Sequence, residues 1–243
     1  MTEGGNPLTF TFIYTNNNTH IMFVELISNT PDAEYVADYA SSTCVDKEPD
    51  GKSLAHALKS GHESVLEHAT FTFHITGISR ACSHQLVRHR LASFSQKSQR
   101  YVKERAFDYV LPDSLIDNAD GSKIYMDTMQ ALRDAYDTLL TLGVPQEDAR
   151  YILPNACTTE LVMTMNVREL RHFFNLRCCN RAQWEIRELA QRMLIICKTV
   201  APSLFADAGP SCAKLHYCPE ARSCGKYPQL KQLLELWENN PKA

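Results

Sequence analysis

The segment ATFTFHI, Ala69–Ile75, alternates apolar and polar residues more strictly than any other part of the chain. Successive side chains of a β-strand point to opposite faces, so one face of this strand would carry Ala69, Phe71, Phe73 and Ile75. The other face would carry Thr70, Thr72 and His74. The pattern therefore predicts a strand that is buried on one face.

Patterns on both sides of this strand predict the other elements. Alternation predicts strands over residues 21–27 and 159–166. Helical spacing predicts helices over residues 31–44, 54–60, 79–90, 122–142, 167–178 and 181–200, and one that starts at Pro145. The Ser/Gln-rich segment SFSQKSQRY, 93–101, predicts a loop. The regular strand-helix-strand period and the Gly-rich turn of a dinucleotide-binding fold are both missing. We therefore predict a single α+β domain, not a Rossmann fold, with a mixed or antiparallel sheet flanked by helices.

The composition is that of a folded globular protein. The chain has 243 residues, of which 44% are hydrophobic and 22% charged, too balanced a mixture for a disordered chain. Residues 1–20 form a polar extension, 21–205 the main domain and 206–243 a cysteine-containing tail. The N-terminus does not resemble a signal peptide, and no apolar run approaches the ~18 residues that span a bilayer. We expect a cytoplasmic protein with reduced cysteines.

Basic residues concentrate in residues 80–105, which contain seven Lys or Arg and one acid, Glu104. Because the whole chain has a net charge of −3, this window carries +6 and the rest carries −9. The balance excludes a globally basic nucleic-acid binder, and the segregation favours a site for a small anion. Guanidinium, hydroxyl and amide donors suit phosphate oxygens in particular. The alternative is an ordinary solvated basic face.

A second group of donors lies in the segment NVRELRHFFNLR, 166–177. On a helix, Arg168, His172 and Asn175 share one face, and apolar residues cover the other. No carboxylate lies on this polar stripe, so its donors are available to an external anion or heterocycle. A surface helix explains the segment equally well.

Arg88-His89-Arg90 is followed by seven residues and then by Ser98. This pattern reproduces the RHR-x7-S signature of the flavin-dependent thymidylate synthases, which the segments described above also resemble. Further similar motifs occur in the family's order: GHES at 61–64, EH at 67–68, FTFH at 71–74, GVP at 143–145, AR-x-x-LP at 149–154, N-x-R at 166–168, NLR at 175–177 and AQWEI at 182–186. The resemblance covers about residues 21–205, and chance agreement of so many spaced motifs is remote.

The resemblance implies two sets of site residues. Positions matching the family's FAD-binding residues are His62, Ser64, Arg88, His89, Arg90, Gln96, Asn166, Val167, Arg168 and His172. Positions matching its deoxyuridine monophosphate (dUMP) site are Gln85, Leu86, Val87, Arg88, Gln96, Lys97, Ser98, Gln99, Arg100, Arg150 and Arg177. Two positions depart from many members, which carry Glu where this chain has Gln96 and Arg where it has His84.

The resemblance also implies a reaction. FAD carries hydride, methylenetetrahydrofolate donates the carbon, NADPH is the reductant, and the products are thymidylate (dTMP) and tetrahydrofolate. The family forms homotetramers whose active sites are shared between subunits, and it uses no enzyme nucleophile. Arg177 matches the arginine that favours ionisation of the uracil ring, which a permanently charged guanidinium can do electrostatically. Membrane and nucleic-acid partners are not expected.

Other readings of the residues stay open. Residues 80–105, with Phe94 and Tyr101 as stacking platforms, could form a single-stranded nucleic-acid-binding module. A metal phosphohydrolase could use the histidines that recur every six residues from His56 to His74, but that period does not gather side chains on one face. Cys212, Cys218 and Cys224 could hold zinc together with His216, or two of them could form a disulfide. Free thiols are our prediction, because the spacing lacks short Cys pairs. We therefore predict no metal.

Overall fold

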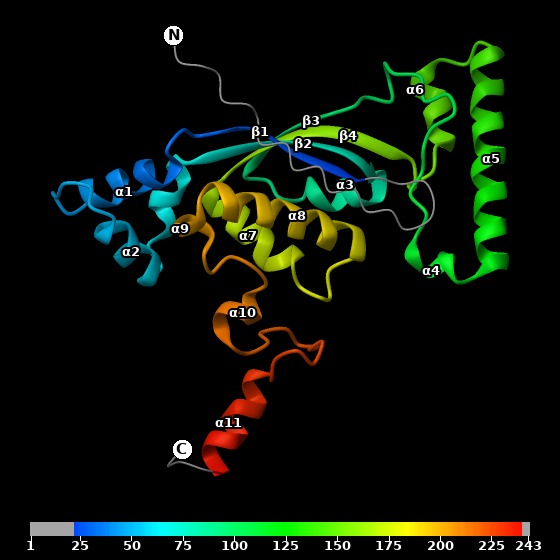
Figure 1. Cartoon of the computed structure of the whole chain (residues 1–243). Coiled ribbons are helices and arrows are strands. Elements are labelled where there is room, and N and C mark those ends of the chain that lie inside the picture. The colour runs from blue at the N-terminus through cyan, green and yellow to red at the C-terminus, as the bar shows by residue number, and fades with distance from the viewer. Residues whose placement is uncertain (1–21, 240–243) are drawn as a thin grey trace, which may run out of the picture. The chain divides into compact units, whose positions relative to one another are not determined.

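A four-stranded antiparallel sheet organises the structure, a computed structural model that describes residues 22–239. Its strands are β1 (Phe23–Asn29), β2 (Thr70–Ser79), β3 (Ala92–Gln96) and β4 (Thr158–Asn166), in the order β1-β2-β4-β3. The predicted α+β class is confirmed (Figure 1). The predicted extension of residues 1–20 lies outside the described residues.

The strand predicted from ATFTFHI is the core of β2. Its apolar face is fully buried, with no measurable exposure of Ala69, Phe71, Phe73 or Ile75. On the opposite face, the Thr72 hydroxyl is 2.9 Å from that of Thr164 on β4, and His74 Nε2 is 2.7 Å from Glu160 Oε1. The alternation therefore predicted both faces correctly.

The chain divides into two compact units, and all three boundaries fall inside strands. Unit 1 holds residues 22–27 and Thr72–Thr164, and unit 2 holds Ser28–Phe71 and residues 165–239. Strands β1, β2 and β4 each run through a boundary, so the single sheet belongs to both units.

Unit 1 also contains the helices formed by residues 80–152. They are α3 (Arg80–Leu86), α4 (Asp113–Ile116), α5 (Ala119–Thr141), α6 (Gln146–Ala149) and the 3-10 helix η2 (Arg150–Ile152). Helix α3 begins as predicted, because the Ser79 hydroxyl accepts a hydrogen bond from the Cys82 backbone N–H. Phe107, Met129 and Cys157 form a buried cluster beside α5.

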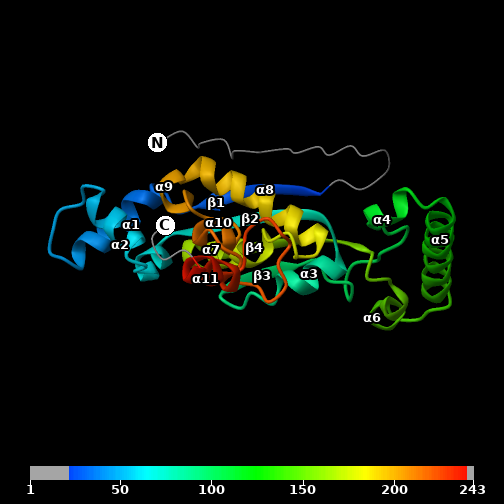
Figure 2. The same cartoon turned by 90° about the horizontal axis from the view of Figure 1, so that it is seen from below.

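Unit 2 contains the remaining helices. They are α1 (Ala33–Thr43), α2 (Lys52–Lys59), the 3-10 helix η1 (Glu63–His68), α7 (Val167–Arg177), α8 (Trp184–Val200), α9 (Pro202–Phe205), α10 (Ser211–Leu215) and α11 (Leu230–Asn239). Helices α1 and α2 lie side by side, as do α7 and α8 (Figures 1 and 2). Phe205 joins this core, with its ring 5.6 Å from Phe71 and 6.0 Å from Phe174. Across residues 22–239, no helix is long and apolar enough to cross a membrane.

Two local predictions were wrong, both near the basic segment. The helix predicted to continue to residue 90 ends at Leu86, because the next backbone bonds, such as His89 N–H to Leu86 O, tighten into a turn. The predicted loop begins instead with the edge strand β3, whose Ser and Gln residues give almost no strand signal by themselves. Arg88-His89-Arg90 therefore connects a helix to a strand.

Candidate functional site

The connection between α3 and β3 presents two unpaired guanidinium groups. The side chains of Arg88 and Arg90 are exposed, and neither has a hydrogen bond or ion pair within residues 22–239. His89 between them is 5% exposed and packs inward. Two unpaired cations two residues apart are suited to an external anion such as a diphosphate.

Three of the predicted dUMP residues lie at the end of α3 and in its C-cap, and they differ in exposure. Leu86 is fully buried and Val87 is exposed, with Gln85 half-buried. Leu86 is therefore a packing residue in this structure, and the side chains open to a ligand are those of Gln85 and Val87.

Gln96 is held by hydroxyls that the sequence did not single out. Its Nε2 donates to Ser83 Oγ at 2.9 Å and to Thr159 Oγ1 at 3.1 Å. Ser83 Oγ in turn donates to the Arg80 carbonyl at 2.9 Å. A glutamate at this position could only accept, so the Ser83 proton would have to turn away from Arg80. The amide therefore fits the local hydrogen-bond pattern, and Gln96 is fixed on β3.

Lys97 is already paired. Its Nζ lies 3.1 Å from Oε2 of Glu104, a carboxylate on a residue that is only 6% exposed. The Glu104 backbone N–H also donates to the hydroxyl of buried Tyr136 at 3.3 Å. Lys97 therefore neutralises a buried acid, and its charge is not available to a ligand in this arrangement.

Glu147 on α6 joins two of the predicted phosphate-binding arginines. Its Oε2 lies 3.3 Å from Arg100 Nε and 3.2 Å from Arg100 Nη2, and its backbone carbonyl accepts from Arg150 Nε at 3.0 Å. The turn before Arg100 is closed by Ser98, whose Oγ accepts from the Arg100 N–H at 3.2 Å. This arrangement orients both guanidinium groups, as an anion site requires.

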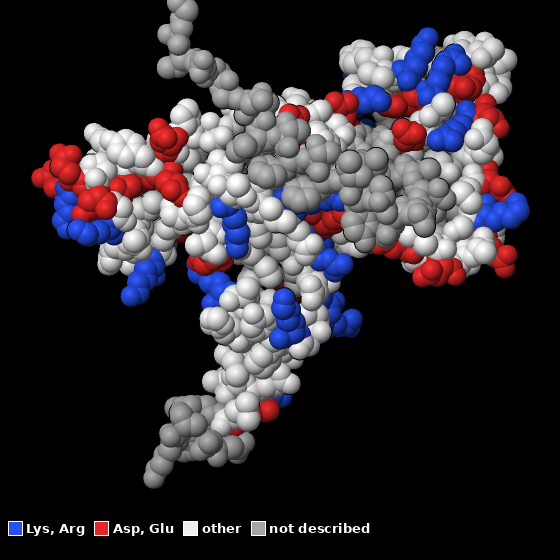
Figure 3. Space-filling model, viewed as in Figure 1, with Lys and Arg blue, Asp and Glu red and all other residues white. Residues whose placement is uncertain are grey.

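Pairing of this kind breaks up the +6 charge of residues 80–105. Arg105 lies 3.5 Å from Asp137, while Arg80 donates to Thr159 and to Gln99, which is buried. Figure 3 shows Lys and Arg interspersed with Asp and Glu over α5 and α6. The basic segment is therefore a set of separate, oriented donors and not a continuous basic field.

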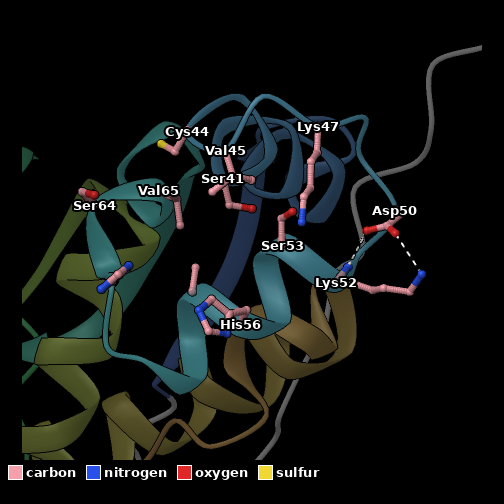
Figure 4. Close-up of a pocket in the computed structure, with 12 residues that line it drawn as sticks. Ser41, Cys44, Val45, Lys47, Asp50, Lys52, Ser53, His56, Ser64 and Val65 are labelled. Carbon is pink, nitrogen blue, oxygen red and sulfur yellow. Dashed lines mark hydrogen bonds and ion pairs between the residues drawn. The ribbon is translucent and has the colours of Figure 1, made fainter.

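In unit 2, His62 and Ser64 line a cavity of about 710 Å³. Its walls come from α1, α2, η1 and the segments that connect them (Figure 4), with Ser41, Cys44, Lys47, Ser53 and His56 among the polar or ionisable lining residues. Among these lining residues, only His62 and Ser64 were predicted to bind FAD, because residues 41–56 contain no family motif. A volume in the ~300–1,000 Å³ range is typical of small-molecule sites.

Helix α7 places its predicted residues in different environments. Asn166 caps the helix, its Oδ1 accepting from the Glu169 N–H at 2.9 Å, and Val167 is fully buried. Arg168 forms an ion pair with Glu67 of η1, which raises the Arg168 pKa. No carboxylate lies on the polar stripe of α7 itself, as predicted, but the fold brings one to it from η1. His172 is exposed and Arg177 half-buried, and each already has an interaction partner.

Arg171, which the sequence did not distinguish, is structural. It is 5% exposed, donates to the Leu204 carbonyl at 2.7 Å and pairs with Asp207 Oδ1 at 2.8 Å. Burial alone would raise the pKa of Asp207, but Arg171 and Lys214 hold it below its ordinary value. Arg171 therefore ties α7 to the segment after α9.

A second cavity in unit 2, of about 240 Å³, is lined by Cys179 together with the three tail cysteines Cys212, Cys218 and Cys224. Burial and the nearness of the other three thiols raise the pKa of Cys212. All four are free cysteines. As they stand, no three His, Cys, Asp or Glu side chains in residues 22–239 are placed to hold one metal ion. The recurring histidines are likewise spread over α2, η1 and β2.

Comparison with known proteins gives one consistent result. Residues 25–203 match the family model described as "Thymidylate synthase complementing protein". The chain is 49% identical to a flavin-dependent thymidylate synthase of Geobacter sulfurreducens, over 87% of this chain and 97% of the relative. It is 44% identical to one of Nitratidesulfovibrio vulgaris, over 84% and 95%, and 47% identical to one of Pyrococcus horikoshii, over 76% and 79%.

Proposed function

The chain belongs to the flavin-dependent thymidylate synthase family, and we propose that its Arg177 side chain activates the uracil ring in the family's reaction. The enzyme converts dUMP to dTMP with FAD as its cofactor. In the proposed reaction, methylenetetrahydrofolate supplies the carbon, NADPH supplies the reducing electrons, and tetrahydrofolate is released.

We assign the dUMP phosphate to the donors of unit 1. Arg100 and Arg150 are both oriented by Glu147, and the Ser98 turn precedes them, which supports this assignment. Arg88, Gln85, Val87, Gln96 and Gln99 complete the proposed substrate group. Because guanidinium groups bind phosphate in a fixed geometry, prior orientation reduces the entropy lost when the nucleotide binds. Lys97 has a smaller role in this proposal, because Glu104 neutralises it.

FAD fits a second set of donors, which shares Arg88 and Gln96 with the substrate group. Arg88 and Arg90 offer two unpaired guanidinium groups to its diphosphate, and His62 and Ser64 line a cavity of small-molecule size. We propose that Arg168 exchanges Glu67 for the cofactor, since their ion pair is half-exposed on both sides and such pairs are weak. His89, Gln96, Asn166, Val167 and His172 are the other proposed FAD positions. When bound, the flavin supplies the hydride.

Arg177 would act electrostatically. Methyl transfer requires carbon 5 of the uracil to become nucleophilic, which is favoured when negative charge develops on the ring. A guanidinium stays protonated at every working pH, so at the end of α7 it can stabilise that charge without moving a proton. No side chain needs to form a covalent bond with the nucleotide.

The substitution Arg177→Ala tests this role directly. We expect FAD to remain bound while dTMP formation falls by ~100-fold or more, the usual cost of losing an electrostatic stabiliser of the transition state. Arg187→Ala on α8, which removes a hydrogen bond to the Asn180 carbonyl, is the control and should retain activity. Turnover at the wild-type rate in Arg177→Ala would overturn the assignment.

The reaction itself is tested by dUMP-dependent oxidation of NADPH, measured with and without methylenetetrahydrofolate. We expect dTMP to form from dUMP only when NADPH, methylenetetrahydrofolate and FAD are all present. The alternative of a single-stranded nucleic-acid-binding module predicts salt-dependent oligonucleotide affinity and no flavin. The family membership supports the enzyme, as does the pairing of Lys97, Arg100 and Arg105 with acids. Cytoplasmic location and a homotetramer remain part of the proposal.

A further inference from the structure

Four cysteines that are distant in the sequence meet around one cavity. Cys179 directly follows the cap of α7, whereas Cys212 lies in α10, Cys218 in a β-bridge to Gln229, and Cys224 in an irregular segment. The thiols are thus supplied by four separate backbone segments. No step of the proposed reaction uses them.

The backbone of the tail is folded so that its three cysteines return to this place. His216 adopts a left-handed conformation, with φ of 58°, at the end of α10, and Gly225 has φ of 86° directly after Cys224. The Cys218 N–H donates to the Pro228 carbonyl at 2.7 Å, which closes the loop between these turns. A left-handed non-glycine residue costs about 1 kcal/mol or more and persists where the surroundings require it.

The tail has little apolar core to maintain this fold. In residues 211–230 the residues are mostly exposed, and Cys218 is the only buried one among them. Segments of this size usually need a disulfide or a metal ion to be stable. The four thiols are the one cluster in the described tail that could supply either.

We propose that Cys179, Cys212, Cys218 and Cys224 bind one Zn²⁺ ion as a structural tetrathiolate site that fastens the tail to the end of α7. Structural zinc is held by four ligands in a tetrahedron, and four thiolates are a common set. This inference replaces our prediction of free thiols and takes Cys179, 33 residues before Cys212, as the fourth ligand, where the sequence had offered His216.

The surroundings of the cavity suit such a site. Zn²⁺ with four thiolates has a net charge of −2, and the cavity is also lined by Arg181 and Lys226, whose charges oppose it. Asn180 Nδ2 lies 3.7 Å from Cys224 Sγ, a contact in which an amide donates to sulfur. Outer partners of this kind orient metal ligands and increase their affinity. Cys178, which also lines the cavity, is 5% exposed and remains a packing residue.

The thiols are not yet at metal-binding distances from one another. Neutral thiols have no attraction that would draw four sulfurs into a tetrahedron, whereas Zn²⁺ replaces their protons and holds each sulfur at ~2.3 Å. The site therefore forms by closure of the tail around the ion, which releases up to four protons.

Metal analysis and cobalt substitution of the full-length protein test the proposal. Protein purified without chelators should contain about one zinc per chain, as structural sites bind with high affinity. Adding Co²⁺ to the reduced, metal-free protein should produce the visible bands of tetrahedral cobalt-thiolate coordination. Cys212→Ser and Cys218→Ser should each weaken zinc binding at least 10-fold, whereas the matched control Cys44→Ser, an exposed thiol outside the cluster, should not.

Three results would overturn the inference: zinc bound equally by all variants, a metal-free protein that gives no tetrahedral cobalt spectrum, or two of these cysteines joined as a disulfide in the purified chain. The cobalt experiment needs no substitution, so it remains decisive even where a serine variant fails to fold. Flavin content and dTMP formation are measured separately, so a failure of the metal site is distinguishable from a failure of the proposed function.

Discussion

At the scale of single residues, Lys97 is a cation of the basic segment whose role is structural and not substrate binding. Its ammonium neutralises Glu104, which is 6% exposed, so Lys97→Met leaves a buried carboxylate without a partner. We expect a loss of about 2 kcal/mol in the free energy of unfolding and a KM for dUMP within about 3-fold of wild type. Denaturant unfolding and steady-state kinetics measure the two effects.

Two matched variants complete that comparison. Lys103→Met removes an exposed charge six residues further along and should change neither quantity. Arg100→Met removes a proposed phosphate ligand and should raise the KM by about 10-fold or more, as expected for the loss of one charged hydrogen bond. A large increase in KM for Lys97→Met would show that the nucleotide displaces Glu104 and binds Lys97 directly.

Arg168 and Arg171 provide a second contrast, within one helix. Arg171 is buried against Asp207 and the Leu204 carbonyl, so Arg171→Met should destabilise the fold by about 2 kcal/mol. The pair formed by Arg168 and Glu67 is half-exposed, so its loss should change the free energy of unfolding little. Arg168→Met should instead weaken FAD binding. Thermal unfolding of the apoprotein measures the loss of stability, and flavin titration measures the loss of FAD binding. A large loss of stability in Arg168→Met, or weaker FAD binding by a stable Arg171→Met, would refute the roles proposed here.

At the scale of elements, the cap of α7 predicts sensitivity to alkaline pH. Burial raises the pKa of Cys178 from its ordinary 9.0 to about 12. Below pH 9 the thiol is neutral in both the folded and the unfolded chain, so its contribution to stability is complete. As the pH rises from 9 towards 12 only the unfolded chain ionises, and this contribution is lost, by about 1 kcal/mol at pH 10.

Cys178→Ala removes this titration. The variant is less stable at pH 8 because of lost packing, but its deficit in melting temperature relative to wild type should narrow by pH 10. Leu189→Ala on α8 also removes a fully buried side chain, but one that does not titrate, so its deficit should stay constant. Parallel pH profiles for wild type and Cys178→Ala would contradict the prediction.

The elements that sequence reasoning found are those in which each residue carries a strong local signal. Phe71, Phe73 and Ile75 alternate with polar residues, so β2 and its buried face could be predicted. Strand β3 could not, because its Ser and Gln side chains favour a loop and its pairing with β4 depends on distant residues. The cations of the site were likewise visible. Their partners Glu67, Glu104 and Glu147 were not, since nothing local distinguishes a pairing acid from a solvated one.

At the scale of the whole molecule, the proposed active site depends on the assembly of several chains. Arg150 lies in unit 1 and Arg177 in unit 2, and we propose that a homotetramer combines groups from different subunits into each site. Light scattering should then give a mass about four times the 27.5 kDa of one chain. A monomer with full activity would rule out shared sites.

Mixing two inactive variants tests the sharing itself. Arg177→Ala alone should be nearly inactive, and Arg150→Ala alone should be nearly inactive at dUMP concentrations well below its raised KM. If Arg150 and Arg177 come to one site from different subunits, tetramers reassembled from an equal mixture contain sites with both arginines intact, about a quarter of the total by random assortment. We expect dTMP formation to recover to about a quarter of the wild-type rate. Arg177→Ala alone, carried through the same reassembly, is the control. Native mass spectrometry should confirm that mixed tetramers form. If they form and the mixture stays inactive, one chain supplies both arginines to each site, because every site then contains one of the two substitutions.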